Sequence, residues 1–462
     1  MAARLDWVRW LWPMAVASTA AMTGLIAGLN PRFAIFAALA FAFVIIVFAD
    51  LTLGVILFTF LAYFETIPGL SGSTLSLTKA AGALLTIAWF ATLVTQHDAK
   101  KDFLRQHPYM AGIIIMFIGW AALSFVWSEK PVQAWEATGR LALNAMLFLI
   151  VYTAIRTPKD ATRVIAAFVI GATAAAALGV MAGAQPTPYG QAARVSGEFE
   201  NANTLASTLV ASLSLSLGLA FALKEHTIRR NLALGAAAFA MLGILLTVSR
   251  SGLVALGVAA IAAIIFSGRW RAKVALVSAG VAVSAVIYFL VFAPPVARDR
   301  VSHLEGGTGR SDIWKVAWRM SERNPAKGVG AGNFRTSSIH YVVVAPGILR
   351  RSDFLVNTQK VAHNVFLETL AELGIVGLTL LLILIVMLVR TLIAAVWQFV
   401  RNGDVQMEII SRAALIALFG LLASLFFSSD QYNKQLWLLL ALGPTLLAIG
   451  RAQAADAEAE ES

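Results

Sequence analysis

The amino-acid sequence predicts an all-α protein that crosses a membrane many times, and three observations lead to this fold class. First, 59% of the residues are hydrophobic and only 13% are charged, a balance that soluble domains of this length do not show. Second, the apolar residues form continuous runs near the ~20 residues that a bilayer requires, without the alternation of a membrane β-barrel. Third, one long segment, 294–363, is polar enough to lie in water. We therefore expect about 12–14 transmembrane helices and one large external loop that contains short helices.

The expected spans follow the apolar runs in chain order. They lie near 11–29, 33–49, 51–64, 78–95, 109–127, 141–155, 164–182, 204–223, 232–248, 252–267, 274–293, 366–397, 409–428 and 435–450. The first run follows Arg4 and Arg9 and resembles a signal peptide, so a cleaved signal is the alternative to an uncleaved first helix. The third run is short and only Asp50 separates it from the second, which leaves the helix count between 12 and 14.

Basic residues in the linkers predict the orientation of the chain, whose net charge is +11. Four alternate linkers carry them, namely Lys100, Lys101 and Arg105; Arg156, Lys159 and Arg163; Lys224, Arg229 and Arg230; and Arg269, Arg271 and Lys273. The positive-inside rule places these linkers and the N-terminus in the cytoplasm. The large loop is then external, and the acidic C-terminal tail is cytoplasmic.

These features divide the chain into five parts. They are the N-terminal helices 1–183, the core helices with arginine-bearing external linkers 184–293, the large loop 294–363, the C-terminal helices 364–450 and the acidic tail 451–462. The composition of the tail predicts disorder. The absence of cysteine excludes disulfides and thiol chemistry. His303, His340 and His363 are too far apart in sequence to supply two metal ligands at helical spacing, so we expect no metal.

Two arginines on the external side are candidates for anion binding. Arg194 lies in the linker before the span at 204–223, and Arg250 lies between Ser249 and Ser251 at a helix mouth. An arginine at a helix mouth is costly unless it faces a cavity, a partner or a headgroup. Interfacial snorkelling is one interpretation of Arg250. The functional interpretation is bidentate binding of a phosphate, with both serines as further donors.

The large loop contains a predicted amphipathic helix that begins at Arg310. Its apolar residues follow helical spacing, which favours a position on the membrane surface, and Asn324-Pro325 ends it. The glycine-rich run 328–333 that follows superficially resembles a nucleotide-binding motif. No strand precedes this run, so a tight turn is the favoured interpretation.

His363 ends the large loop where the next apolar helix begins. A neutral imidazole there could accept a proton from a hydroxyl or orient an acceptor. The alternative is a histidine that bonds to backbone near a helix start. Glu368 and Glu372 follow one turn apart; they could orient the histidine, although a structural ion pair is the favoured role. Asp430 and Lys434 are also expected to form a local pair, at i, i+4.

Several of these residues belong to motifs that occur in a characteristic order. They are Arg194-x-Ser-Gly-x-Phe-x-x-Ala-Asn203, Ser249-Arg250-Ser-Gly252, Gly309-Arg310-x-x-x-Trp314, Asn324-Pro325 with Gly328-x-Gly330-x-Gly332-Asn333-Phe334, and His363-Asn364-x-x-Leu367-Glu368 with Gly374-Ile-x-Gly377. Over about 194–377 the chain resembles the bacterial O-antigen ligase and polysaccharide polymerase superfamily. The N-terminal helices match it only in hydropathy.

The resemblance implies a protein of the bacterial inner membrane whose helices enclose a cavity open to the periplasm, with the large loop periplasmic. It implies transfer of a glycan from an undecaprenyl-pyrophosphate-linked donor to a hydroxyl of another glycan or of lipid A core. No metal, cofactor or nucleic acid takes part, and membrane lipids surround the site. Arg194 and Arg250 would bind the pyrophosphate, and His363 would lie beside the acceptor hydroxyl. The expected substrate site is completed by Arg310, Ser249, Ser251, Asn203, Asn364 and Glu368.

The main alternative function is a flippase or another transporter of lipid-linked oligosaccharides. A transporter needs polar residues deep within its spans and no large external loop with a histidine. This chain has the loop and few deep polar residues, which favours the enzyme. Ligase and polymerase share the motifs and stay open as alternatives, as do the acceptor, the sugars and the oligomeric state.

Overall fold

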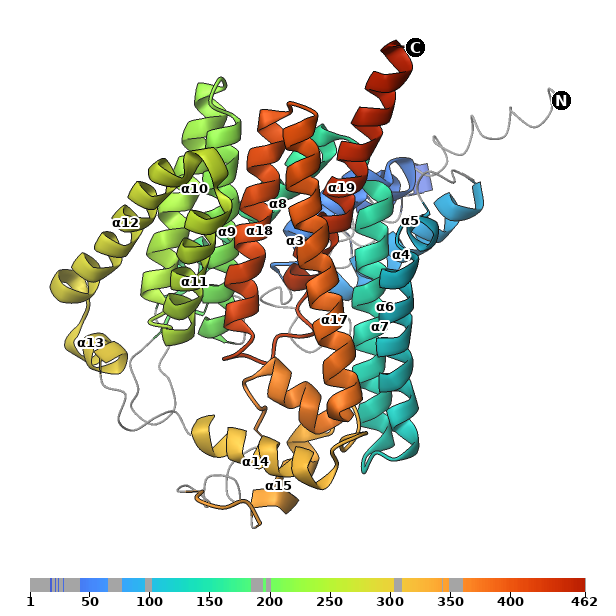
Figure 1. Ribbon diagram of the computed structural model, residues 1–462, viewed down its shortest axis with the longest axis vertical. Coiled ribbons are helices and arrows are strands. Elements are labelled where there is room, and N and C mark those ends of the chain that lie inside the picture. Colours follow the sequence, from blue (N-terminus) through green and yellow to red (C-terminus); the bar gives the residue numbers. More distant parts are fainter. Residues whose placement is uncertain are drawn as a thin grey trace.

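The computed structural model describes residues 42–64, 77–95, 102–183, 194–196, 201–302, 310–342, 344–348 and 360–461, together with five isolated positions (17, 18, 21, 24 and 28). The first expected span and most of the second therefore lie outside the described residues, as do Lys100, Lys101 and His303. The rest is a helical bundle with the two helices of residues 310–323 and 334–342 at one end (Figure 1).

The bounds of the helices are α3 (Leu51–Leu61), α4 (Leu77–Thr95), α5 (Phe103–Gln106), α6 (Pro108–Leu123), η2 (Ser124–Val126), α7 (Pro131–Ala154), α8 (Pro158–Ala182), α9 (Ala202–Ala222), α10 (Thr227–Leu246), α11 (Arg250–Phe266), η4 (Gly268–Trp270), α12 (Arg271–Ile287), η5 (Tyr288–Phe292), α13 (Pro295–Ser302), α14 (Arg310–Arg323), α15 (Phe334–Val342), α17 (Val365–Arg401), α18 (Val405–Ser424) and α19 (Lys434–Glu461).

The polytopic fold class is confirmed. Within the described residues, 9 helices are long and apolar enough to cross a membrane. Three shorter apolar helices correspond to α3, α4 and α11. Every expected span from 51–64 onward therefore has a helix. Asp50 separates α3 from the preceding helical residues as a cap, because its carboxylate accepts bonds from Thr52 N (2.8 Å) and Leu53 N (3.2 Å).

Helix α9 is the centre of one half of the bundle and packs against α8, α10, α11 and α18. Its sequence is rich in alanine and serine, and small residues allow helices in a membrane to approach closely. At Gly218 the approach is so close that an added Cβ would collide with Ala413 of α18. The other half contains α6, α7, α17 and α19, and α18 contacts both halves.

The amphipathic helix of the large loop is confirmed as α14, which ends before Asn324-Pro325. Four of its apolar residues, Ile313, Val316, Ala317 and Met320, are buried and form a small core with Phe334 of α15 and Ala371 of α17, whereas Trp318 is exposed. This differs from the expected use of the apolar face on a membrane, whereas the position of α14 relative to the membrane surface stays a prediction. The apolar face is used for packing within the protein, so α14 and α15 form a cap that is fixed to the start of α17.

The acidic tail also differs from its expected state. We expected disorder over 451–462, whereas α19 continues as a helix to Glu461. The segment is rich in alanine and glutamate, which are strong helix formers, and it extends a helix that is already nucleated in the bundle. Figure 1 shows this end of α19 projecting away from the end of the bundle that carries α14 and α15.

Candidate active site

The first group of site residues joins the start of α9 to the turn between α10 and α11. Arg194 donates from Nε to the carbonyl of Thr247 (2.8 Å) and from Nη2 to Oδ1 of Asn203 (2.9 Å). Ser249 donates to the same Asn203 oxygen at 2.7 Å. Two motifs that are distant in sequence are therefore held together through one amide oxygen. We call Arg194, Asn203, Ser249, Arg250 and Ser251 the arginine cluster.

Within the arginine cluster, Ser249 caps α11. Its hydroxyl accepts from Gly252 N (3.1 Å) and lies 2.9 Å from the Ser251 hydroxyl. The only hydroxyl proton of Ser249 is directed to Asn203. Ser251 is therefore the donor in the hydrogen bond between the two serines. Arg250 is the first residue of α11, half-buried at a helix N-terminus, where the backbone dipole favours an anion.

Two non-glycine residues among those described have a positive φ, Val248 (46°) and His363 (50°). A β-branched residue in this region is an outlier, and such strain concentrates at functional sites. Val248 directly precedes Ser249 and Arg250, and His363 is the candidate base. Residues with unfavourable backbone angles thus occur at or beside Arg250 and His363, the two places where the sequence predicts catalytic residues.

His363 is held by the loop between α18 and α19 and by α17. Its backbone N–H donates to the Ser429 hydroxyl (3.0 Å), and that hydroxyl donates to Glu368 Oε2. Glu368 also accepts from Ala362 N (3.3 Å) and from Gln431 Nε2 (2.9 Å). Glu368 therefore positions the chain around His363. The expected ion pair of Glu368 is wrong, because within the described structure its partners are N–H and O–H donors.

The imidazole of His363 lies in a cationic, half-buried environment. Burial, together with the nearby charges of Arg310, Arg335 and Lys360, lowers the pKa of His363 to about 4. Both causes disfavour the charged ring. The imidazole is therefore neutral at physiological pH, which is the form that can accept a proton. Arg310, at the start of α14, is close enough to influence it, as a shared site requires.

The arginine cluster and His363 are connected through neighbouring residues. Thr204, next to Asn203 on α9, donates to the Asp430 carboxylate at 3.0 and 3.3 Å. Asp430 follows Ser429, which holds His363. The expected Asp430–Lys434 pair is wrong. The Asp430 carboxylate accepts from Thr204 instead, and Lys434 donates to the Thr78 hydroxyl (3.2 Å). A tertiary contact has replaced the local one.

Glu372 fixes the glycine-rich turn to α17. Its carboxylate accepts from Gly332 N and Phe334 N, both at 2.9 Å, and its carbonyl accepts from Gly330 N at 2.8 Å. Gly328, Gly330 and Gly332 all have positive φ. The tight turn is thus confirmed. The expected ion pair of Glu372 is wrong, because its carboxylate binds backbone N–H groups of the turn within the described structure.

Gly374 opposes this turn and kinks α17, with φ 66° and ψ −167°. This conformation belongs to glycine, and an added Cβ would collide with the Ala326 carbonyl. We expect Gly374→Ala to destabilise the protein by at least ~1–3 kcal/mol. The measurement is thermal unfolding in detergent, with Gly257→Ala as the control because space surrounds that position. Equal melting temperatures for the two variants would contradict a required glycine at 374.

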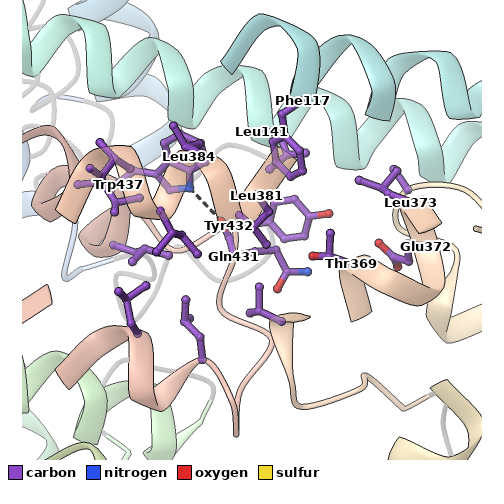
Figure 2. Close-up of a pocket in the computed structure, with 18 residues that line it drawn as sticks. Phe117, Leu141, Thr369, Glu372, Leu373, Leu381, Leu384, Gln431, Tyr432 and Trp437 are labelled. Carbon is purple, nitrogen blue, oxygen red and sulfur yellow. Dashed lines mark hydrogen bonds between the residues drawn. The ribbon is translucent and has the colours of Figure 1, made fainter. Parts of the chain in front are cut away.

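A small cavity of about 50 Å³ lies between α6, α7, α17, α18 and α19. Its wall is mainly aliphatic, and its polar side chains are Thr369, Glu372, Gln431 and Tyr432. Figure 2 shows these four side chains grouped at one part of the cavity. Trp437 donates to the Gln431 carbonyl at 2.9 Å and so fixes this wall. The cavity is an apolar chamber whose polar part adjoins the segment that holds His363.

Residues 235–382 match the family model described as O-antigen ligase. The chain is similar to O-antigen ligases. This confirms the resemblance to the O-antigen ligase and polymerase superfamily, although the match covers less than half of the chain. No curated protein matches the sequence. The O-antigen ligase-like segment contains Arg250, Arg310, His363 and Glu368, whereas Arg194 and Asn203 precede it.

Around this O-antigen ligase-like segment, the structure groups most of the expected site residues. Asn364 has a structural contact, because its side-chain oxygen caps α17 by accepting from Phe366 N and Leu367 N, both at 3.0 Å. The sequence analysis missed Ser429 and Gln431, and it gave Asp430 the wrong partner. The available signal was a run of polar residues, 428–431, between two strongly apolar spans.

Proposed function

We propose that this protein transfers a glycan from an undecaprenyl-pyrophosphate-linked donor to a hydroxyl acceptor. The family match supports a membrane glycosyltransferase-like role in O-antigen assembly, and the proposal adds the donor, the acceptor and the residues. The observation that carries it is the bonded connection from Arg194 and Asn203, through the adjacent Thr204 and Asp430, to Ser429 and His363. The proposed anion-binding residues and the proposed neutral base are thus connected through bonded and adjacent residues.

The donor side of the proposed reaction is the arginine cluster. Cleavage of the sugar–pyrophosphate bond leaves its electron pair on the departing phosphate oxygen, so the enzyme must stabilise negative charge there. Arg250 and the N-terminus of α11 supply positive charge, and Arg194 is fixed beside them by Thr247 and Asn203. Fixed donors need no reorganisation when the charge develops.

The acceptor side is His363. The acceptor oxygen attacks the anomeric carbon, its proton passes to the neutral imidazole, and undecaprenyl pyrophosphate leaves. The nearby cations that lower the pKa of His363 keep the ring available as a base. Arg310 and Arg335, whose charges act on His363, would attract an anionic part of either substrate.

The test is transfer by purified protein in detergent or nanodiscs. With a lipid-linked donor and an acceptor, the expected products are a covalently extended acceptor and free undecaprenyl pyrophosphate. Movement of the intact donor across a vesicle membrane without a covalent product would instead support a transporter. In cells, loss of long chains on lipid A core after gene deletion indicates a ligase, whereas single-repeat products indicate a polymerase.

The orientation of the bundle gives a prediction of its own. The basic linkers at α8, α9–α10 and α11–α12 lie at the end of the bundle opposite to α14 and α15 (Figure 1). By the positive-inside rule, the cap and the candidate site face the periplasm. Reporter fusions after Gly306 and after the C-terminus should therefore report opposite sides of the membrane. The orientation is overturned if both reporters lie on one side.

A further inference from the structure

A second, larger cavity lies far from His363, toward the other end of the bundle. It has a volume of about 840 Å³ and is bounded by α9, α11, α12, α18 and the start of α10. Most of its wall is aliphatic, with Leu217, Leu256, Val277 and Ile416 as examples from the four long helices. We call this space the basic-end groove.

Helix α12 forms one side of the basic-end groove while leaving the bundle. None of its residues is buried, and Figure 1 shows it diverging from α10 and α11 toward α13. Val274, Val277 and Val281 of α12 line the groove. An aliphatic channel beside a helix that faces the membrane suits an acyl chain better than a polar solute.

The end of the groove is cationic. Lys224, Arg230, Lys273 and Arg412 line it against one carboxylate, Glu225. Arg412 is already bound, because it bonds to Glu408 at 2.9 Å. Lys224, Arg230 and Lys273 make no ion pair with any residue that the structure describes, and all three are exposed. The apolar channel therefore ends at three lysine and arginine side chains that are available to an anion.

We infer that the basic-end groove binds an anionic glycerophospholipid. Its acyl chains would occupy the aliphatic channel, and its phosphate would lie among Lys224, Arg230 and Lys273. The argument is charge complementarity combined with an apolar wall, since neither a soluble anion nor a neutral lipid satisfies both parts. This site is separate from the arginine cluster and does not depend on the proposed reaction.

The test measures lipid binding to the full-length protein in a neutral detergent, by native mass spectrometry. The probe is phosphatidylglycerol, compared with phosphatidylcholine, undecaprenyl phosphate and glycerol 3-phosphate. We expect retention of phosphatidylglycerol and a loss of at least ~10-fold in its affinity for the Lys224→Ala, Arg230→Ala, Lys273→Ala triple variant, because each such cation attracts an anionic headgroup measurably. Arg229→Ala is the matched control, since Arg229 is adjacent and exposed but does not line the groove.

A second variant tests the apolar wall of the basic-end groove and distinguishes lipid binding from a general effect of surface charge. Ala260→Trp should obstruct the groove and displace the lipid while every cation remains. Equal weakening by Arg229→Ala would reduce the effect to general surface charge and overturn the site. Glycerol 3-phosphate binding as tightly as the lipid, or undecaprenyl phosphate displacing phosphatidylglycerol, would overturn the assignment to a phospholipid. Retention of phosphatidylglycerol by Ala260→Trp would also overturn it.

Discussion

Replacing His363 by alanine should lower the rate of glycan transfer by ~10²–10⁴, the usual value of a positioned proton acceptor. The backbone N–H of residue 363 can still bond to Ser429, so the frame around it is expected to stay folded. Donor binding should therefore persist while turnover is lost. The measurement is single-turnover transfer with saturating lipid-linked donor, together with a separate donor-binding assay.

The matched control is His340→Ala, because His340 lies in the same cap, is exposed and bonds to Glu129 at 3.0 Å. That variant should retain most activity. Normal turnover by His363→Ala would refute the role of His363 as a base. If donor binding were lost instead, His363 would belong to the pyrophosphate site.

The pH dependence provides an independent check on the same residue. Burial and neighbouring cations lower the pKa of His363 to about 4, so the ring is neutral above that pH and charged below it. Transfer should then stay level as pH falls from 7.5 to 5.5, where an ordinary histidine with a pKa of about 6.5 would be ~90% protonated. A loss of activity centred near pH 6.5 would contradict the environment described for His363.

Replacing Arg250 or Arg194 by alanine should each cost at least ~2 kcal/mol of transition-state stabilisation, about 30-fold in rate. The reason is that each variant loses a charged hydrogen-bond donor to the negative charge that develops on the departing pyrophosphate. Arg→Lys should restore only part of the rate, because an ammonium cannot reproduce the two parallel bonds of a guanidinium. The assay is the rate of undecaprenyl pyrophosphate release at saturating acceptor.

Arg194 and Arg250 differ in the bonds that they make within the protein. Arg194 also holds Thr247 and Asn203, so Arg194→Ala needs a melting curve beside its activity. Arg323→Ala is the control for a lost positive charge, because Arg323 is exposed at the end of α14. Near-normal rates for both Arg250→Ala and Arg194→Ala would show that neither residue handles the pyrophosphate.

The sequence predicted the transmembrane helices well because the period and length of apolar runs are local properties. It also predicted α14 and the turn at 328–333, where spacing and glycine determine the local backbone. It misplaced the partners of Glu368, Glu372 and Asp430. Each of these carboxylates has a suitable cation within a few residues or in the large loop, and a local pattern favours that cation as a partner. Apart from the bond between Ala362 N and Glu368, the partners named above come from segments 38–226 residues away.

The tail and the face of α14 show the same limitation. An acidic, alanine-rich end is polar enough to predict disorder, yet it continues a helix that tertiary packing has already started. The apolar face of α14 could suit a membrane surface or another helix equally well. Only the position of α17 determines that it packs within the protein.

One consequence concerns how proteins with this fold could diversify. His363 is the last residue of the large loop, but it is held by Ser429 and, through Ser429, by Glu368 of α17. Trp314 of the loop also donates to the Ala362 carbonyl at 3.1 Å. Loop positions that make no contact with this segment can therefore change without removing the bonds from Ser429 and Glu368. Under the proposed function, remodelling those positions could exchange one acceptor for another while the residues proposed to bind the lipid-linked donor stay the same.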